Sequence, residues 1–184
     1  MNEKLNINNI VTIGQNIQNV NIIVTDIEKN IKYMTHIPKS LANDNHTIRK
    51  GVVNVIQDTI NKYNIDTIIL EQNQLFIDRI DRYPDPSVMK NIILGFGIKV
   101  AIEDNFWDTI ENIMEIPKYE WKNAILNKKV DYAIDLYKSH IIQENIYTPT
   151  ELQDIDNNNY YETLCMSEIS LCNKYMNKKY KINK

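Results

Sequence analysis

Two glutamates occupy positions where a carboxylate could do chemistry. Glu71 directly follows the apolar run from Ile68 to Leu70, and Glu162 begins a helical row that continues with Cys165. An acid that ends a buried strand leaves the sheet at its carboxyl edge, where open α/β sheets bind their ligands. An acid on an apolar helix face must be paired or coordinate a metal, because burying an isolated charge is costly. The two carboxylates form a candidate site only if the fold brings them face to face.

Each glutamate also has a plain structural alternative. Acids commonly close strands without any function, which would account for Glu71. A solvated acid in the first turn of a helix is stabilised by the helix dipole, which would account for Glu162. The residues alone leave both interpretations open.

A stretch of cations and aromatic rings is a further candidate. Lys118, Trp121 and Lys122 lie close together, and Lys128 and Lys129 follow. Such a surface can hold a phosphate backbone and stack a base. The alternative is a solvated helix whose Trp121 side chain packs inward.

Gly14 ends the first apolar segment, in the run Ile13-Gly14-Gln15-Asn16. A glycine lets the backbone pass close beside a ligand or a neighbouring strand. The alternative is a plain hairpin turn.

Cysteine and histidine do not indicate a metal site. Cys165 and Cys172 lie two helical turns apart on one expected face, which predicts buried free thiols in a reducing compartment. His36, His46 and His140 are scattered, and none has a partner at metal-ligand spacing.

The elements that must position these residues begin with three short strands, predicted at 10–13, 20–24 and 31–37. Short polar connectors between them are typical of antiparallel hairpins. A helix is predicted over 47–63, where apolar residues recur at helical spacing. The run 66–71 has no alternation, which indicates a strand covered on both faces at the centre of a sheet.

The second half of the chain predicts a helix that carries Val88 and Ile92, followed by a turn at Gly95 and Gly97 and a buried strand at 98–102. A helix between two buried strands is a crossover unit, so these strands are expected to be parallel. Three further segments read as helical: 117–126, 130–143 and 160–176.

Length and composition fit one globular domain over residues 1–184, with flexible ends expected at 1–8 and 178–184. The chain is 43% hydrophobic and 24% charged. No apolar run approaches the ~20 residues of a membrane span, and the N-terminus lacks a signal-peptide pattern. We therefore expect an intracellular, cytoplasmic protein without a membrane partner. The net charge of −3 is unusual for a protein that holds nucleic acid over a broad surface.

Three short motifs occur in a characteristic order: Thr12-Ile13-Gly14-Gln15-Asn16 on the first strand, Leu70-Glu71-Gln72 on the fourth, and Asn159-Tyr160-Tyr161-Glu162 at the last helix. This order resembles the RuvC-type Holliday junction resolvases, and the poxvirus branch most of all. In that branch the first strand carries Asp-Ile-Gly, the fourth strand ends in Leu-Glu, and the last helix holds two acids three residues apart. The resemblance implies an α/β, RNase H-like fold. Its mixed five-stranded sheet has three antiparallel strands followed by two parallel ones, with helices on both faces.

The resemblance also implies a site, and this chain departs from it. In the resembled family four carboxylates hold two Mg²⁺ ions, which activate a water and stabilise the leaving oxygen during strand cleavage. By position, Thr12 and Asn159 replace two of these acids, so Glu71 and Glu162 remain as the implied catalytic and metal-binding residues. Two carboxylates neutralise only half the charge of two Mg²⁺ ions. Asp156 is the first substitute ligand to consider if the register is shifted, ahead of Asp26 and Asp154.

These departures predict a degenerate resolvase homologue that is catalytically weak or inactive and is retained for nucleic-acid binding or as a structural subunit of a larger assembly. The alternative is an active Mg²⁺-dependent endonuclease that resolves four-way junctions, with Lys118, Lys122, Lys128 and Lys129 steering phosphates. An unrelated α/β module for a small ligand is a third possibility, because fold does not fix function. The resemblance implies branched or double-stranded DNA as a partner. It also implies a homodimer, because a two-fold protein matches the two symmetric cleavage points of a junction.

Overall fold

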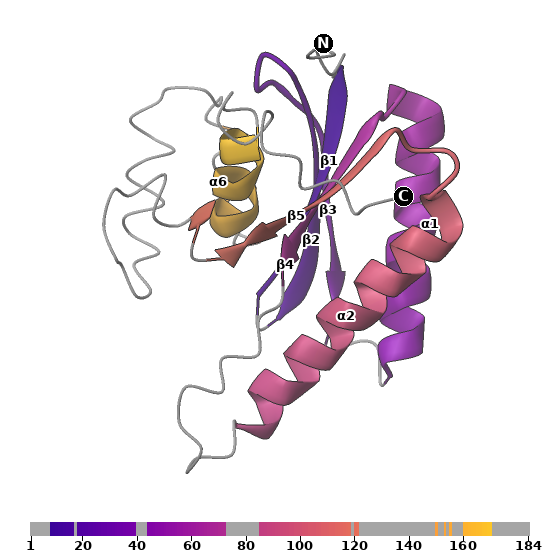
Figure 1. Cartoon of the computed structure of the whole chain (residues 1–184). Helices are drawn as coiled ribbons and strands as arrows, with labels where there is room; N and C mark the ends of the chain where they lie inside the picture. The colour runs from indigo at the N-terminus through magenta and orange to yellow at the C-terminus, as the bar shows by residue number, and fades with distance from the viewer. Residues whose placement is uncertain are drawn as a thin grey trace.

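The computed structural model describes residues 8–16, 18–39, 44–72, 85–118, 120–121 and 160–170, together with positions 150, 153 and 155. Within these residues a five-stranded sheet carries helices on both faces (Figure 1). The elements follow in the order β1 (Asn9–Gln15), β2 (Asn19–Asp26), β3 (Ile31–Pro38), α1 (Asn45–Tyr63), β4 (Thr67–Gln72), α2 (Pro86–Phe106), β5 (Asn112–Pro117) and α6 (Tyr161–Ser170).

The sheet has the strand order β3-β2-β1-β4-β5. Strands β1, β2 and β3 pair antiparallel, whereas β4 is parallel to both β1 and β5. The predicted mixed sheet of three antiparallel strands and two parallel ones is therefore confirmed. Because β4 lies between β1 and β5, Glu71 near the end of β4 is flanked by these two strands.

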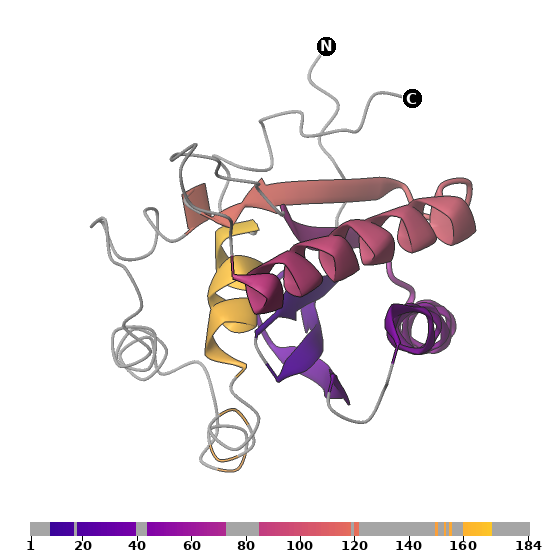
Figure 2. The same ribbon diagram turned by 90° about the horizontal axis from the view of Figure 1, so that it is seen from below.

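Alternation along the strands divides the core into two layers. On one face Ile10, Ile23 and Ile69 pack against α6. On the other face Val11, Ile22 and Ile68 pack against α1 and α2. Figure 2 shows α6 and α1 on opposite sides of the sheet. The strand β4 is buried from Thr67 to Leu70, as expected for a strand covered on both faces.

Helix α1 confirms the predicted helix over 47–63. The Asp44 side chain caps its start by accepting a hydrogen bond from the backbone N–H of Thr47, and Asn64 ends it in the left-handed conformation. Its buried face consists of Ile48, Val52, Ile56 and Thr59.

The strand predicted at 98–102 is wrong, because α2 runs without interruption through Gly95 and Gly97 to Phe106. The apolar residues of this region recur every four positions, which is helical spacing, and the buried members are Leu94, Ile98, Ile102 and Phe106. Gly97 lies close to the Arg49 side chain of α1, so its missing side chain serves helix packing and not a turn. The predicted crossover unit exists, but its second strand is β5.

The predicted helix over 117–126 begins after Pro117, the last residue of β5, since Lys118, Glu120 and Trp121 are helical. Helix α6 confirms the described part of the helix predicted over 160–176. The helix predicted at 130–143 lies outside the described residues, as do the expected flexible end at 178–184 and all but residue 8 of the one expected at 1–8. No helix in the described part of the chain is long and apolar enough to cross a membrane.

Candidate functional site

The candidate site lies on the α6 side of the sheet, where β1 and β4 end and α6 begins. Glu71 follows Ile69 by two positions on β4, so its side chain faces α6 as that of Ile69 does. Glu162 lies in the first turn of α6. Lys118 directly follows β5, and β5 pairs with β4 so that Ile116 lies opposite Glu71. Three separate elements thus deliver three charged side chains to one place.

The lysine joins the two carboxylates. The Nζ atom of Lys118 lies 3.4 Å from Oε1 of Glu71 and 3.4 Å from Oε2 of Glu162. The Glu71 side chain is only 8% exposed, whereas those of Glu162 and Lys118 are 23% and 37% exposed. Burial lowers the pKa of Lys118, but the two carboxylates outweigh this effect, so its pKa lies above the usual value. The fold therefore brings the predicted glutamates together through a shared ammonium group.

Lys39 is a second cation at this edge, and sequence reasoning missed it. Its ammonium group donates to Oε1 of Gln15, to the backbone carbonyl of Asn16 and to Oδ1 of Asn91, at 3.2, 2.6 and 2.8 Å. Burial lowers the pKa of Lys39 to about 8; the Glu71 carboxylate opposes this effect and Lys118 adds to it. Because the partners of Lys39 come from β1, its turn and α2, no local motif could have identified it.

Thr12 lies one row deeper in the sheet than Glu71. It is fully buried, pairs with Ile69 and Ile23 on the neighbouring strands, and faces α6. Its Oγ1 atom has no hydrogen-bond partner among the described residues. The position implied for an acid thus holds a neutral group in an apolar layer.

Gly14 serves close packing between β1 and α6. A Cβ atom built on Gly14 would collide with the Oγ1 atom of Thr163. The close neighbour of Gly14 is therefore a helix, and Gly14 lies within β1, so neither the ligand or neighbouring strand nor the plain turn describes it. The hairpin turn itself lies beyond it and is built on Asn16, whose side chain accepts from the backbone N–H groups of Gln18 and Asn19.

Trp121 is 1% exposed and packs in the core beneath α6. A ring in this position has no open face on which a base could stack. The inward-packing alternative therefore describes Trp121, and the predicted base-stacking role does not. Lys122, Lys128 and Lys129 lie outside the described residues.

The substitute ligands fare differently. Asp26 pairs with Asn9 at the start of β1, far along that strand from Gly14, and forms a 2.8 Å ion pair with Lys32. It is thus at the wrong end of the sheet to join Glu71, and the prediction of Asp26 as a ligand is wrong. Asp154, Asp156 and Asn159 lie outside the described residues.

The described residues do not fit a two-Mg²⁺ centre. Among them no group of three or more His, Cys, Asp or Glu side chains could hold a metal ion. Hard divalent cations need several anionic oxygens, but the two carboxylates here already face an ammonium group, and Thr12 adds no charge. Lys39 interacts electrostatically with Glu71 as well, so this carboxylate is under the influence of two ammonium groups.

Cys165 is a buried free thiol, as predicted. Burial raises its pKa well above the ordinary value, and the carboxylates of Glu168 and Glu162 add to the effect. A protonated, buried thiol contributes apolar packing. Cys172 lies outside the described residues.

The fold is that of a class of DNA-processing proteins, the Holliday junction resolvases. RuvC from Thermus thermophilus matches with a TM-score of 0.55 at 10% identity, over 88% of this chain and 94% of RuvC. A second structure of this RuvC, in complex with a Holliday junction substrate, matches with a TM-score of 0.53 at 10% identity, over 89% of this chain and 94% of the RuvC chain. The yeast mitochondrial resolvase Ydc2 matches with 0.52 at 12% identity, over 91% of this chain and 77% of Ydc2.

The fowlpox virus resolvase, in complex with its junction, aligns with a TM-score of 0.47 at 16% identity, over 91% of this chain and 96% of that one. No protein-family model matches the chain, and no curated protein does. The matches to RuvC and Ydc2, at 10% to 12% identity, establish the fold alone. The predicted RuvC-type, RNase H-like fold is confirmed, and the poxvirus branch stays a prediction.

Proposed function

We propose that this resolvase-fold protein binds branched DNA at the edge where β1 and β4 end, and that it is weak or inactive as a metal-dependent nuclease. The observation that carries this proposal is the Lys118 ammonium group held between Glu71 and Glu162. It presents a partly exposed ammonium group at the position implied for catalysis, where a DNA phosphate would approach. It also occupies the carboxylates that a catalytic metal would require.

The case for DNA rests on fold and local charge together. A solved structure of the same fold holds a Holliday junction. Lys39 and Lys118 both lie where strands of this chain end, and lysine side chains bind phosphates in a salt-dependent way. The net charge of −3 argues against a broad DNA-binding surface and favours a local one.

The case against efficient cleavage rests on Thr12 and Lys118. Two-metal cleavage requires ions that activate the water and stabilise the leaving oxygen. Thr12 is neutral and fully buried, and Lys118 forms ion pairs with both glutamates that remain. Retention as a structural subunit of a larger assembly is compatible with the same observations.

An active endonuclease is the second candidate, and the convergence of Glu71 and Glu162 favours it. In that case the protein would nick a four-way junction in Mg²⁺ or Mn²⁺, and Glu71→Gln would abolish nicking. A small-ligand module is a third candidate. One cavity among the described residues, between Ile13, Leu70 and Ile98, has a volume of about 20 Å³, which suits one water molecule and no larger ligand.

The test is fluorescence anisotropy with a four-way junction and a linear duplex of equal length, in EDTA. We expect the junction to bind more tightly than the duplex. Lys118→Ala should weaken junction binding by about three- to tenfold. It should also reduce the slope of log affinity against log salt concentration by about one, as loss of a phosphate contact does. Lys32→Ala, at the opposite end of the sheet, is the matched control. Absence of binding to either DNA would refute the proposal, and efficient nicking would replace it with the second candidate.

A further inference from the structure

Lys118 occupies the place between two carboxylates that a bound cation would need. Its Nζ atom is 3.4 Å from an oxygen of Glu71 and 3.4 Å from an oxygen of Glu162. The three side chains come from the end of β5, the end of β4 and the first turn of α6. Their meeting is set by the sheet register and by the packing of α6, and it does not depend on one flexible segment.

A divalent ion bound by both carboxylates would compete with this ammonium group for the same oxygens. Like charges at such separations repel strongly in a partly buried site. The Lys39 ammonium group, held at the same end of β1 by Gln15 and Asn16, also interacts electrostatically with Glu71. No compensating anion comes from Thr12, which is buried in the row beneath.

Without the Lys118 ammonium group, Glu71 and Glu162 would form a site that lacks its cation. Glu71 is almost entirely buried, and a buried carboxylate that loses its cation must be protonated, be hydrated or gain another cation. Glu162 would still point at the same space. A divalent ion would satisfy both acids at once.

We propose that the Lys118 ammonium group is the resident cation of this site, that it excludes divalent metal ions from Glu71 and Glu162 in the free protein, and that its removal uncovers a divalent-cation site. The inference concerns the same residues as the proposed function. Its test uses protein without DNA, so either proposal can fail while the other stands.

The experiment titrates Mn²⁺ and follows the free-ion signal by electron paramagnetic resonance. The wild-type protein is expected to bind no stoichiometric Mn²⁺. Lys118→Met, which keeps most of the length of the side chain but removes its charge, should bind one ion at least about tenfold more tightly than the wild-type protein does. Adding Glu71→Gln to Lys118→Met should remove the gained site.

Two control variants make the result specific. Lys118→Arg keeps the cation and should bind no Mn²⁺. Lys32 forms an ion pair with a single carboxylate, that of Asp26, at the other end of the sheet. Lys32→Met should not gain a comparable site, and an equal gain there would overturn the proposal.

Wild-type protein compared with Glu71→Gln can also overturn the inference. Stoichiometric Mn²⁺ binding that is lost in Glu71→Gln would show that the lysine does not exclude the metal. This measurement decides the question even if Lys118→Met fails to fold. A Lys118→Met protein that folds, by circular dichroism, and binds no more Mn²⁺ than wild type would equally refute the proposal.

Discussion

Gly14 of β1 lies so close to Thr163 of α6 that a Cβ atom at residue 14 would overlap the Thr163 hydroxyl oxygen. Thr163 is buried and its β-branched side chain has few alternative rotamers. We therefore predict that Gly14→Ala lowers the free energy of unfolding by about 1–3 kcal/mol, the usual cost of overpacking. Urea denaturation followed by circular dichroism measures this change.

Gly51 provides the control for that substitution. It lies within α1, and a Cβ atom there would meet only the end of the Ile37 side chain, at 3.2 Å. Gly51→Ala should be neutral or stabilising by up to about 1 kcal/mol, because alanine is the better helix former. Equal effects of the two substitutions would show that the Gly14 contact is not special.

The ion pairs of Lys118 predict a specific pattern of non-additivity. Lys118→Met alone leaves the carboxylates of Glu71 and Glu162 without their shared cation and should destabilise the protein by about 1–2 kcal/mol, a value reduced for partial exposure. The double variant Glu71→Gln/Lys118→Met should be more stable than Lys118→Met, since one uncompensated charge is gone. A double-mutant cycle by urea denaturation measures the coupling. Strict additivity would contradict the ion pair.

Local patterns in the sequence predicted most of the sheet but misplaced one strand. The segments around Ile10, Val20 and Ile31 have strand periodicity and short connectors, so local pattern was enough. In α2 the run from Ile98 to Ile102 contains alternating apolar residues that also fit a helix. Its buried positions are separated by four residues, and only packing against α1 and β4 distinguishes the two interpretations.

In the candidate site, too, the sequence identified residues with a local signal and missed contacts that depend on the fold. Glu71 and Glu162 were identifiable because each stands at the end of an element. Lys118 was recognised as a cation but not as their shared partner, because that contact depends on the parallel register of β5 against β4. Lys39 carries no sequence signal, since its environment is assembled from distant segments.

Lys39 predicts a dependence of stability on pH. Its folded-state pKa of about 8 lies below the value of 10.5 for an exposed lysine. Between these values the unfolded chain binds more protons than the folded one, so this residue makes stability rise with pH. We expect the stability of wild type relative to Lys39→Met to increase from pH 7 to pH 9.5. Urea denaturation of both proteins across this range measures it, and a constant or falling difference would contradict the lowered pKa.

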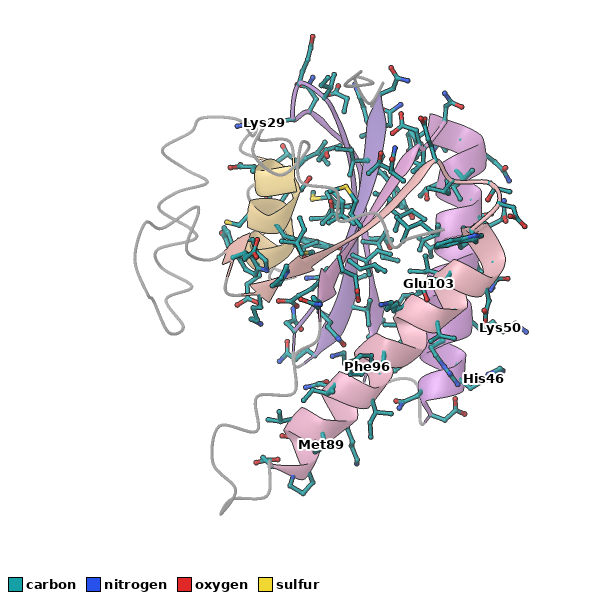
Figure 3. The ribbon with its side chains drawn as sticks, viewed as in Figure 1. Lys29, His46, Lys50, Met89, Phe96 and Glu103 are labelled. Atoms are coloured by element: carbon teal, nitrogen blue, oxygen red, sulfur yellow. The ribbon has the colours of Figure 1, made fainter. Side chains whose placement is uncertain are left out.

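The exposed apolar face of α2 is a candidate surface for the expected homodimer. Four of the five large apolar side chains that are exposed in the described part of the chain lie on this helix: Val88, Ile93, Phe96 and Val100. Met89 and Phe96 are labelled on α2 in Figure 3. If the protein dimerises through this face, Phe96→Glu should shift its mass to that of a monomer in light scattering.

Ile27 is the matched control, because it is exposed at the turn between β2 and β3, away from α2. Ile27→Glu should leave the mass unchanged. A dimer that persists in Phe96→Glu would exclude this face, and a monomeric wild-type protein would refute the homodimer itself.

Two substitutions of Thr12 are expected to change the free energy of unfolding in opposite directions. Its hydroxyl is fully buried and lacks a partner among the described residues, and such a group costs about 1–3 kcal/mol relative to an apolar isostere. Thr12→Val should therefore raise the free energy of unfolding by about 1 kcal/mol. Thr12→Asp should lower it at pH 7 and recover part of the loss at pH 4, where the new carboxyl group is protonated and burial is less costly. Denaturation at both pH values tests the pair, and a destabilising Thr12→Val would reveal a hydrogen bond to this hydroxyl.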